Sequence, residues 1–156
     1  MRGKPKRMNI LIVLGIGIVA LLAAAAAVLS QVEDWSRDFR TNFAAIEPDA
    51  TDERLRPLRT SLAPAALAER VETAIKPLAN WRLQSGEGAG DSIKMHFVRS
   101  TALWRFKDDI RVTITPASGS GSVLTATSQS RVGKGDLGQN PRNLRELLAA
   151  VRRTIE

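Results

Sequence analysis

The alternation of apolar and polar positions separates a long apolar run near the N-terminus from a polar remainder with short periodic stretches. Residues Ile10 to Leu29 hold no charged or strongly polar side chain. A helix of this length spans about 30 Å, the thickness of the hydrocarbon core of a bilayer. The run is apolar on every face, unlike the helices that border the core of a soluble domain. The pattern therefore predicts a transmembrane helix over residues 10–29.

Two later segments carry apolar side chains at the three- and four-residue spacing of an amphipathic helix. The first runs from Pro64 to Lys76, with proline in its first turn and Pro77 just past its end. The second runs from about Pro141 to Thr154, with Asn140 as the expected N-cap. The apolar stripe of the second helix consists of Leu144, Leu147, Leu148, Val151 and Ile155.

Four stretches between these helices have the alternation of half-buried strands. Short turns separate most of them, which predicts an antiparallel meander. The predicted fold class is α+β, a two-layer domain with an antiparallel sheet of about four strands and helices on one face. The predicted strands cover residues 81–85, 92–100, 110–115 and 123–130, with a turn at residues 86–90 and a connection at residues 101–109 that carries Trp104 and Phe106.

Residues 30–60 are predicted to form a linker or membrane-proximal segment ahead of an exported domain over residues 61–156. Residues 31–46 have apolar side chains three and four apart. They form either a helix that continues out of the membrane, with Trp35 at the interface, or a linker that packs on the domain. Three arginines follow and form either a solvated basic loop, which we favour, or a contact with lipid headgroups. These are Arg54, Arg56 and Arg59.

Charge predicts the orientation of the chain in the membrane. Residues 1–9 carry four basic side chains just before the apolar run, so the positive-inside rule makes them a cytoplasmic tail and places the domain outside. The alternative is a cleaved signal peptide, because Ala23 to Ala27 offers small-residue cleavage sites. The length of the apolar run favours an uncleaved anchor.

The remaining composition excludes several classes of site. Of the formal net charge of +7, the tail supplies four units, and the other 19 basic residues face 16 acidic ones. This balance and the absence of Tyr give no indication of nucleic acid binding. The chain has no cysteine, which excludes disulfides and cysteine metal sites. His96 is the single histidine and is predicted to be a solvent-facing or hydrogen-bonded strand residue. We expect no metal and no cofactor.

Candidate catalytic groups are sparse. Asp108 and Asp109 are neighbours, and neighbours in a strand point to opposite faces, so the two carboxyl groups would not share a proton. A turn in which one of them bonds the backbone is favoured. Ser128 and Ser130 lie on one face but not in a nucleophile-elbow pattern. An enzyme is therefore not favoured.

The stretch from Ser128 to Leu148 joins the last strand to the last helix and contains the candidate binding site. Its glycines spell G-x-G-x-x-G, but the helix cap follows the last glycine, which excludes the dinucleotide fingerprint. Lys134 is not followed by Ser or Thr, which excludes a P-loop. One hypothesis places a small anion at the helix N-terminus, and its binding residues would be Arg131, Lys134, Arg142, Gly133 and Gly135. The other hypothesis, which we favour, is an internal ion pair between Arg131 and Asp136 that fixes the loop.

These residues also carry a resemblance to a known family. The stretch is similar to the S-x-S-R-x-G-x-x-D-x-G-x-N signature of domain of unknown function 1499, and Phe106 with the two aspartates resembles its second motif. The likeness covers roughly Thr41 to Arg153. The family pattern has Arg three residues after the final Asn, where this chain has Asn143. The signature residues are Ser128, Ser130, Arg131, Gly133, Asp136, Gly138 and Asn140.

The resemblance implies a fold and no activity. The family occurs in bacteria and in plastid-bearing organisms, and together with the orientation predicted from charge we expect a bacterial inner-membrane protein with a periplasmic domain. Ser130, Asp136, Gly138 and Asn140 are expected to be structural residues of the loop. The predicted function is a membrane-anchored, non-catalytic domain that binds a membrane-protein partner or serves as an accessory subunit. The alternative is binding of a small anionic ligand or lipid headgroup at the Gly-rich loop.

Overall fold

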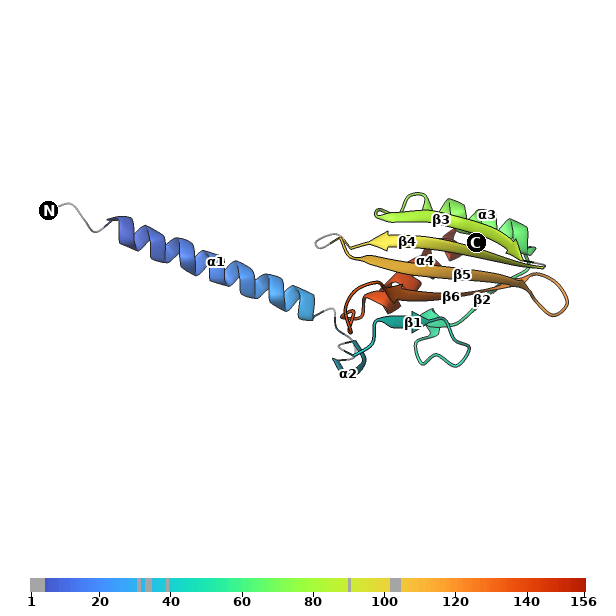
Figure 1. Ribbon diagram of the computed structural model, residues 1–156, viewed down its shortest axis with the longest axis horizontal. Coiled ribbons are helices and arrows are strands. Elements are labelled where there is room, and N and C mark those ends of the chain that lie inside the picture. The colour runs from blue at the N-terminus through green and yellow to red at the C-terminus, as the bar shows by residue number, and fades with distance from the viewer. Residues whose placement is uncertain (1–4, 31, 33–34, 39, 90, 102–104) are drawn as a thin grey trace.

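The computed structural model describes residues 5–30, 32, 35–38, 40–89, 91–101 and 105–156, and every structural statement below concerns these residues. Its first element is the helix α1, Pro5–Leu29, which extends away from the rest of the protein (Figure 1). The window Ile10–Ala27 is apolar enough to cross a membrane and buries none of its surface inside the protein. The predicted long apolar helix is therefore present.

The rest of the chain forms an α+β domain around one antiparallel sheet, as predicted. Its strands are β1 (Phe43–Ala45), β2 (Leu58–Thr60), β3 (Trp81–Ala89), β4 (Ser92–Ser100), β5 (Lys107–Pro116) and β6 (Ser122–Ser130). The strand order is β1-β6-β5-β4-β3, with β2 also paired to β6. The meander of β3 to β6 confirms the predicted topology, but the predicted number of about four strands is wrong, because the sheet has six.

The two additional strands come from the segment for which a linker was predicted. β1 pairs with the end of β6 at Phe43 and Gln129, and β2 pairs with its beginning at Leu58 and Leu124. Each has three residues, too few to show an alternation in the sequence. Of the two alternatives for residues 31–46, the continuous helix is wrong, since among the described residues of that segment only Trp35–Asp38, α2, is helical and β1 follows it. Residues 31, 33, 34 and 39 of that segment lie outside the described residues.

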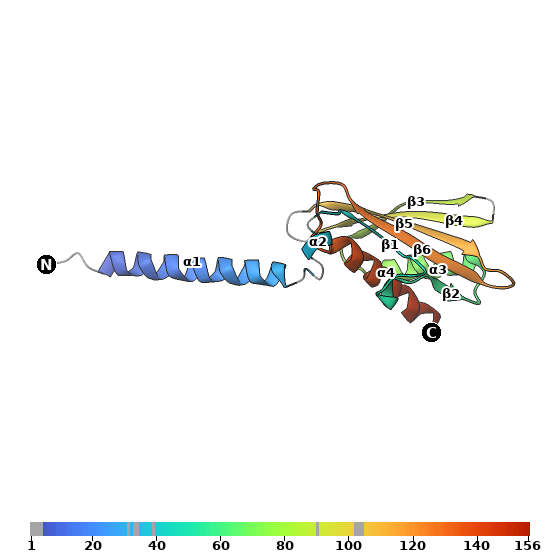
Figure 2. The ribbon, with the colours of Figure 1, turned by 90° about the horizontal axis from the view of Figure 1, so that it is seen from below.

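Two helices cover one face of the sheet (Figure 2), and the hydrophobic core lies between the helices and the sheet. They are α3, Pro64–Ile75, and α4, Gln139–Ile155, close to the predicted ranges. Their apolar stripes face the sheet because its alternate positions are apolar on that side. The largest fully buried apolar side chains are Phe97, Leu67, Ile110, Ile114, Leu124, Leu144, Leu147, Leu148, Val71, Val112 and Val151.

Two strands are longer than predicted, and the longer β5 includes the two neighbouring aspartates. β3 continues through Gly86 and Gly88, so the predicted turn over residues 86–90 starts too early. β5 starts at Lys107, so Asp108 and Asp109 lie in a strand and the predicted turn at these residues is wrong. The connection before it includes Trp104, which lies outside the described residues.

Within the described part of the chain, no helix covers the opposite face of the sheet (Figure 2). The register places Ser85, His96, Arg111 and Thr127 in one row across this open face. One end of the sheet gathers the end of β6 and the start of β1, β5 and α4 next to α2 and the C-terminal end of α1 (Figure 1). The hairpin between β5 and β6 lies at the far end.

Candidate functional site

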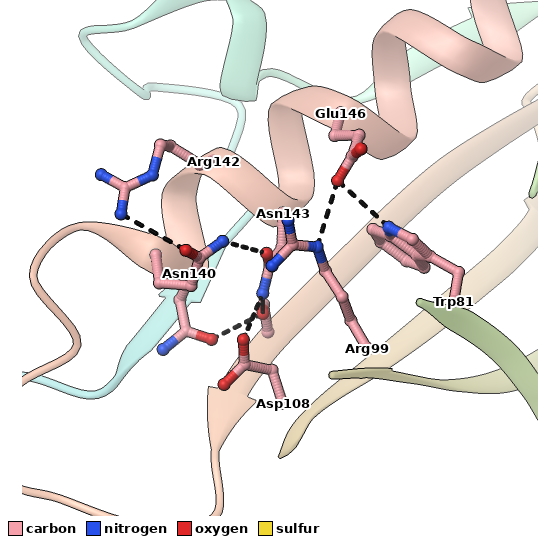
Figure 3. A network of polar contacts seen from close by, with 9 residues as sticks. Trp81, Arg99, Asp108, Asn140, Arg142, Asn143 and Glu146 are labelled. Carbon is pink, nitrogen blue, oxygen red and sulfur yellow. Dashed lines mark hydrogen bonds and ion pairs between the residues drawn. The ribbon is translucent and has the colours of Figure 1, made fainter. Parts of the chain in front are cut away.

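A closed ring of buried polar side chains joins β5, β6 and α4, and Figure 3 shows its members Asp108, Asn140 and Asn143. Ser130 Oγ donates to Asp108 Oδ1 at 2.7 Å and accepts from Asn140 Nδ2 at 3.1 Å. Ser128 Oγ donates to Asn140 Oδ1 at 2.6 Å and accepts from Asn143 Nδ2 at 3.1 Å. Asn143 Nδ2 closes the ring on Asp108 Oδ2 at 2.9 Å. We call these five residues the polar ring.

Every side-chain nitrogen and oxygen of the polar ring has at least one hydrogen-bond partner. Asn140 Nδ2 also donates to the backbone carbonyl of Asn42, just before β1, and Asn143 Oδ1 accepts from Gln139 Nε2. Among the described residues, no buried side-chain nitrogen or oxygen lacks a partner. Buried polar groups that are fully paired fix a unique arrangement of the elements that carry them. The ring therefore holds the N-terminal end of α4 and the start of β1 against β5 and β6.

The side chain that accepts hydrogen bonds from the N-terminus of α4 is that of Asp136, and not that of Asn140. The helix N-cap is Gly138, which has a positive φ of 75°. The Asp136 carboxylate accepts from the backbone N–H groups of Gly138 and Asn140 at 2.8 and 2.9 Å. The predicted cap role of Asn140 is wrong because its side chain is drawn into the polar ring. Burial raises the pKa of Asp136, although these two backbone hydrogen bonds act in the opposite direction.

The backbone at this helix N-terminus is occupied by internal partners. The N–H groups of Asp136 and Leu137 both donate to the carbonyl of Asp38 at 3.0 Å. The N–H of Gln139 donates to the Asp136 carbonyl. All five N–H groups from Asp136 to Asn140 thus have an acceptor within the chain.

Arg131 pairs with Asp109 and not with Asp136, so the favoured ion pair of the sequence analysis is wrong. Its Nε and Nη2 donate to the two carboxylate oxygens of Asp109 at 2.8 and 2.7 Å. Asp109 Oδ1 also lies 2.7 Å from His96 Nε2. The predicted hydrogen-bonded state of His96 is therefore present. The register explains this pairing, because Asp109 faces the open side of the sheet while Asp108 faces the polar ring.

The hydrogen bonds from Arg131 lower the pKa of Asp109 from 3.8 to about 2, while burial opposes them and His96 adds to them. The same contact raises the pKa of Arg131. Such a carboxylate stabilises the fold above its unfolded-state pKa, and this contribution is lost as the pH falls through the folded-state value.

We expect Asp109→Asn to lower the urea midpoint of the domain at neutral pH and to have little effect near pH 2, because the stabilisation is lost between about 3.8 and about 2. Measuring the midpoint of both proteins at the two pH values checks this. Asp49→Asn is the matched control, since Asp49 is exposed, and it should be silent at both. A deficit of equal size at both pH values would contradict the ion-pair assignment.

The remaining residues of the predicted anion site are spread around the loop. Lys134 is exposed, and Gly133 has a positive φ of 94°. Arg142 Nη1 donates to the carbonyl of Leu137 at 3.0 Å. The structure thus places the predicted residues in the loop and the first turn of α4, but gives Arg131, Arg142 and the helix N–H groups internal partners. Anion binding by Arg131, Lys134, Arg142, Gly133 and Gly135 stays a prediction.

A groove of about 560 Å³ lies on the open face, away from the loop. Its lining includes two cations, Lys94 on β4 and Arg111 on β5. Neither side chain forms a hydrogen bond or ion pair with any described residue, not even with Glu87, which is opposite Lys94 in the register. The other polar lining groups include His96, Thr113, Thr125 and Thr127.

The sequence analysis missed several of these roles, although part of the signal was present. Asp108 shares the parity of Ile110, which indicates the covered face. Asn143 lies three residues after Asn140 and so on the same side of α4. The two groove cations alternate with buried residues, which indicates the open face. No local pattern indicates that the backbone carbonyl of Asn42 accepts a hydrogen bond from the polar ring.

Residues 23–151 match the family model described as "Protein of unknown function (DUF1499)". The matched range includes all six strands and the whole polar ring. The match confirms the resemblance of the chain to this family. No curated protein matches the chain.

Proposed function

The chain belongs to the DUF1499 family of proteins of unknown function, and on that premise we propose that it is a membrane-anchored, non-catalytic binding domain. Its binding surface is the groove on the open face of the sheet. The chemical group that it recognises is an anion, carried by a membrane-protein partner or by a small ligand. The observation that carries the proposal is the pair of unpartnered cations, Lys94 and Arg111, in the groove of the open face.

The size and charge of the groove support binding of this kind. A volume of about 560 Å³ lies in the range of small-ligand sites. Two cations without partners attract an anion more strongly than cations already neutralised by carboxylates. The neighbouring hydroxyl groups of Thr113 and Thr127 add donors that suit phosphate or carboxylate oxygens. By contrast, the cation of the loop at the end of β6, Arg131, is neutralised by Asp109.

The side chains of the site favour binding over catalysis. The nearest approach to a catalytic pair is His96 with Asp109, a base with an orienting carboxylate. No serine or threonine hydroxyl among the described residues hydrogen-bonds to His96. Ser128 and Ser130 are buried in the polar ring on the other face.

The proposed location is a bacterial inner membrane, with α1 spanning it once and the domain in the periplasm. The length and apolar character of α1 support the span. The basic residues before it support a cytoplasmic N-terminus. In this location the groove faces partners of the same membrane, as an accessory subunit requires.

We expect inorganic phosphate to stabilise the full chain in detergent, and Lys94→Ala and Arg111→Ala to abolish this stabilisation. A ligand bound only to the native state raises the free energy of unfolding by about 1.4 kcal/mol for each tenfold increase above its Kd. Thermal unfolding at increasing phosphate concentration measures the effect. The matched control is Arg153→Ala, which removes an exposed cation from α4 and should keep the phosphate response.

The same titration tests the loop. If Arg131→Ala and Lys134→Ala abolish the response while the groove variants keep it, the anion binds at the helix N-terminus and the groove proposal is wrong. If the wild-type protein shows no response to phosphate, the groove does not bind a free anion. A peptide of acidic residues in place of phosphate then distinguishes a polypeptide partner from a small ligand, since only the former needs several carboxylates.

A further inference from the structure

The end of the sheet beside α2 exposes aromatic, apolar and basic side chains together. We call it the membrane-proximal end and define it by two sets of exposed residues. The apolar set is Trp35, Phe43, Phe106 and Val132. The basic set is Arg40, Arg105, Lys107 and Lys134.

The topology brings these residues to one end. Phe43 lies at the start of β1 opposite Gln129 near the end of β6. Lys107 starts β5, and its carbonyl accepts from the N–H of Arg131, just before Val132. Asn42 Nδ2 donates to the carbonyl of Gly133 at 2.8 Å in the loop that carries Lys134.

The carboxylates of this end are turned inward. Asp38 and Asp108 are buried. Asp109 is held by Arg131 and His96, and Asp136 by backbone N–H groups. Among the described residues of the membrane-proximal end, every fully exposed charge is therefore positive.

The chain connection keeps this end close to the apolar helix. The carbonyl of Asp38 accepts from the N–H groups of Asp136 and Leu137, and α1 ends at Leu29. Nine residues reach at most about 32 Å when fully extended, and less here because Trp35–Asp38 is helical. The opposite end of the sheet lies a further length of β6 away, about 30 Å for nine residues. If α1 crosses a membrane, the membrane-proximal end is the part of the domain nearest to its surface (Figure 1).

We propose that the membrane-proximal end lies against the same bilayer, with its aromatic and apolar side chains in the interface and its cations on anionic lipid headgroups. Trp and Phe favour the boundary between water and hydrocarbon. Lys and Arg near a surface are attracted to anionic lipids within a Debye length. This contact rests on the proposed span by α1. It orients the groove of the open face sideways, toward other proteins of the same membrane.

The absence of cysteine permits a direct test on the full chain in vesicles. Val132→Cys is labelled with an environment-sensitive NBD fluorophore in vesicles of phosphatidylglycerol and phosphatidylcholine. We expect a blue-shifted emission that lipids with brominated acyl chains quench. The matched control is Ser118→Cys, exposed in the hairpin at the far end, whose emission should resemble that of the label in water.

The charge dependence is tested with lipid and protein variants. Vesicles of phosphatidylcholine alone, or the double variant Lys107→Glu with Lys134→Glu, should remove most of the blue shift. The control pair Arg59→Glu with Arg153→Glu makes the same change of charge elsewhere on the exposed surface and should keep it. Equal urea midpoints for both pairs establish that the domain remains folded.

The outcomes separate this inference from the proposed function. If the Val132→Cys label emits like the Ser118→Cys label in phosphatidylglycerol vesicles, the surface contact does not exist. A blue shift of the same size in vesicles of phosphatidylcholine alone and in the Lys107→Glu with Lys134→Glu variant overturns the headgroup part of the proposal. Flotation of the vesicles after an alkaline carbonate wash reports on the span alone: protein that floats while the label stays water-like refutes only the contact. Protein that the wash releases refutes the span itself.

Discussion

Replacing Leu148 by alanine is expected to lower the free energy of unfolding of the domain by about 2–5 kcal/mol, the range for truncating a buried leucine. Leu148 lies at the centre of the apolar stripe of α4 and is 1% exposed. The loss has two parts, the transfer of the removed methyl groups and the cavity that the packed sheet cannot close. Urea unfolding of the full chain in detergent, followed by tryptophan fluorescence, measures it.

Two variants make this measurement specific. Leu148→Met keeps the side-chain volume and should cost less than about 1.5 kcal/mol. Ala149→Ser changes the next, exposed position of the same helix and should leave the midpoint within about 0.5 kcal/mol. An unchanged midpoint for Leu148→Ala would show that α4 does not pack on the sheet.

Asn140→Ala is expected to cost about 2–4 kcal/mol, because it opens the polar ring. The substitution leaves Ser128 Oγ without its acceptor and the carbonyl of Asn42 without its side-chain donor, in a buried site. Each buried polar group left without a partner costs about 1–3 kcal/mol. The same urea unfolding experiment measures the loss. Gln129→Ala, at an exposed position of β6, is the control and should be nearly silent.

A double-mutant cycle distinguishes loss of the ring from loss of volume. Ser128→Ala removes the partner of Asn140 Oδ1, so the double variant should lose less stability than the sum of the two single variants. The expected coupling energy is about 0.5–3 kcal/mol for residues in one hydrogen-bond network. Strict additivity would mean that the two side chains do not interact.

The polar ring gives a structural meaning to the residues in which this chain resembles the family. The resemblance is carried by Ser128, Ser130, Asn140 and Asp108, yet all four are buried and bonded within the ring. Their position between β5, β6 and α4 also places Asp109 and Arg131 on the opposite face. These buried residues therefore fix how α4 packs on the sheet, while other residues line the groove.

The lipid contact illustrates the difference between nearness in sequence and nearness in space. Arg54, Arg56 and Arg59 follow the apolar helix closely in the chain, but Arg54 pairs with Asp52 and Arg56 with Glu53. Arg59 pairs in register with Val123, near the far end of β6. The membrane-proximal end takes the exposed cations Lys107 and Lys134 from the second half of the chain.

The sequence by itself determined the apolar helix, the two amphipathic helices and the meander of β3 to β6. These features follow from periodic burial, which every local segment records in its own residues. Only the tertiary structure decided the strands β1 and β2, the partner of Arg131 and the closure of the polar ring. The reason is that hydrogen-bond partners are neighbours in space. Arg131 bonds to a carboxylate 22 positions away, and Asn140 to a carbonyl 98 positions away, and no local pattern carries those separations.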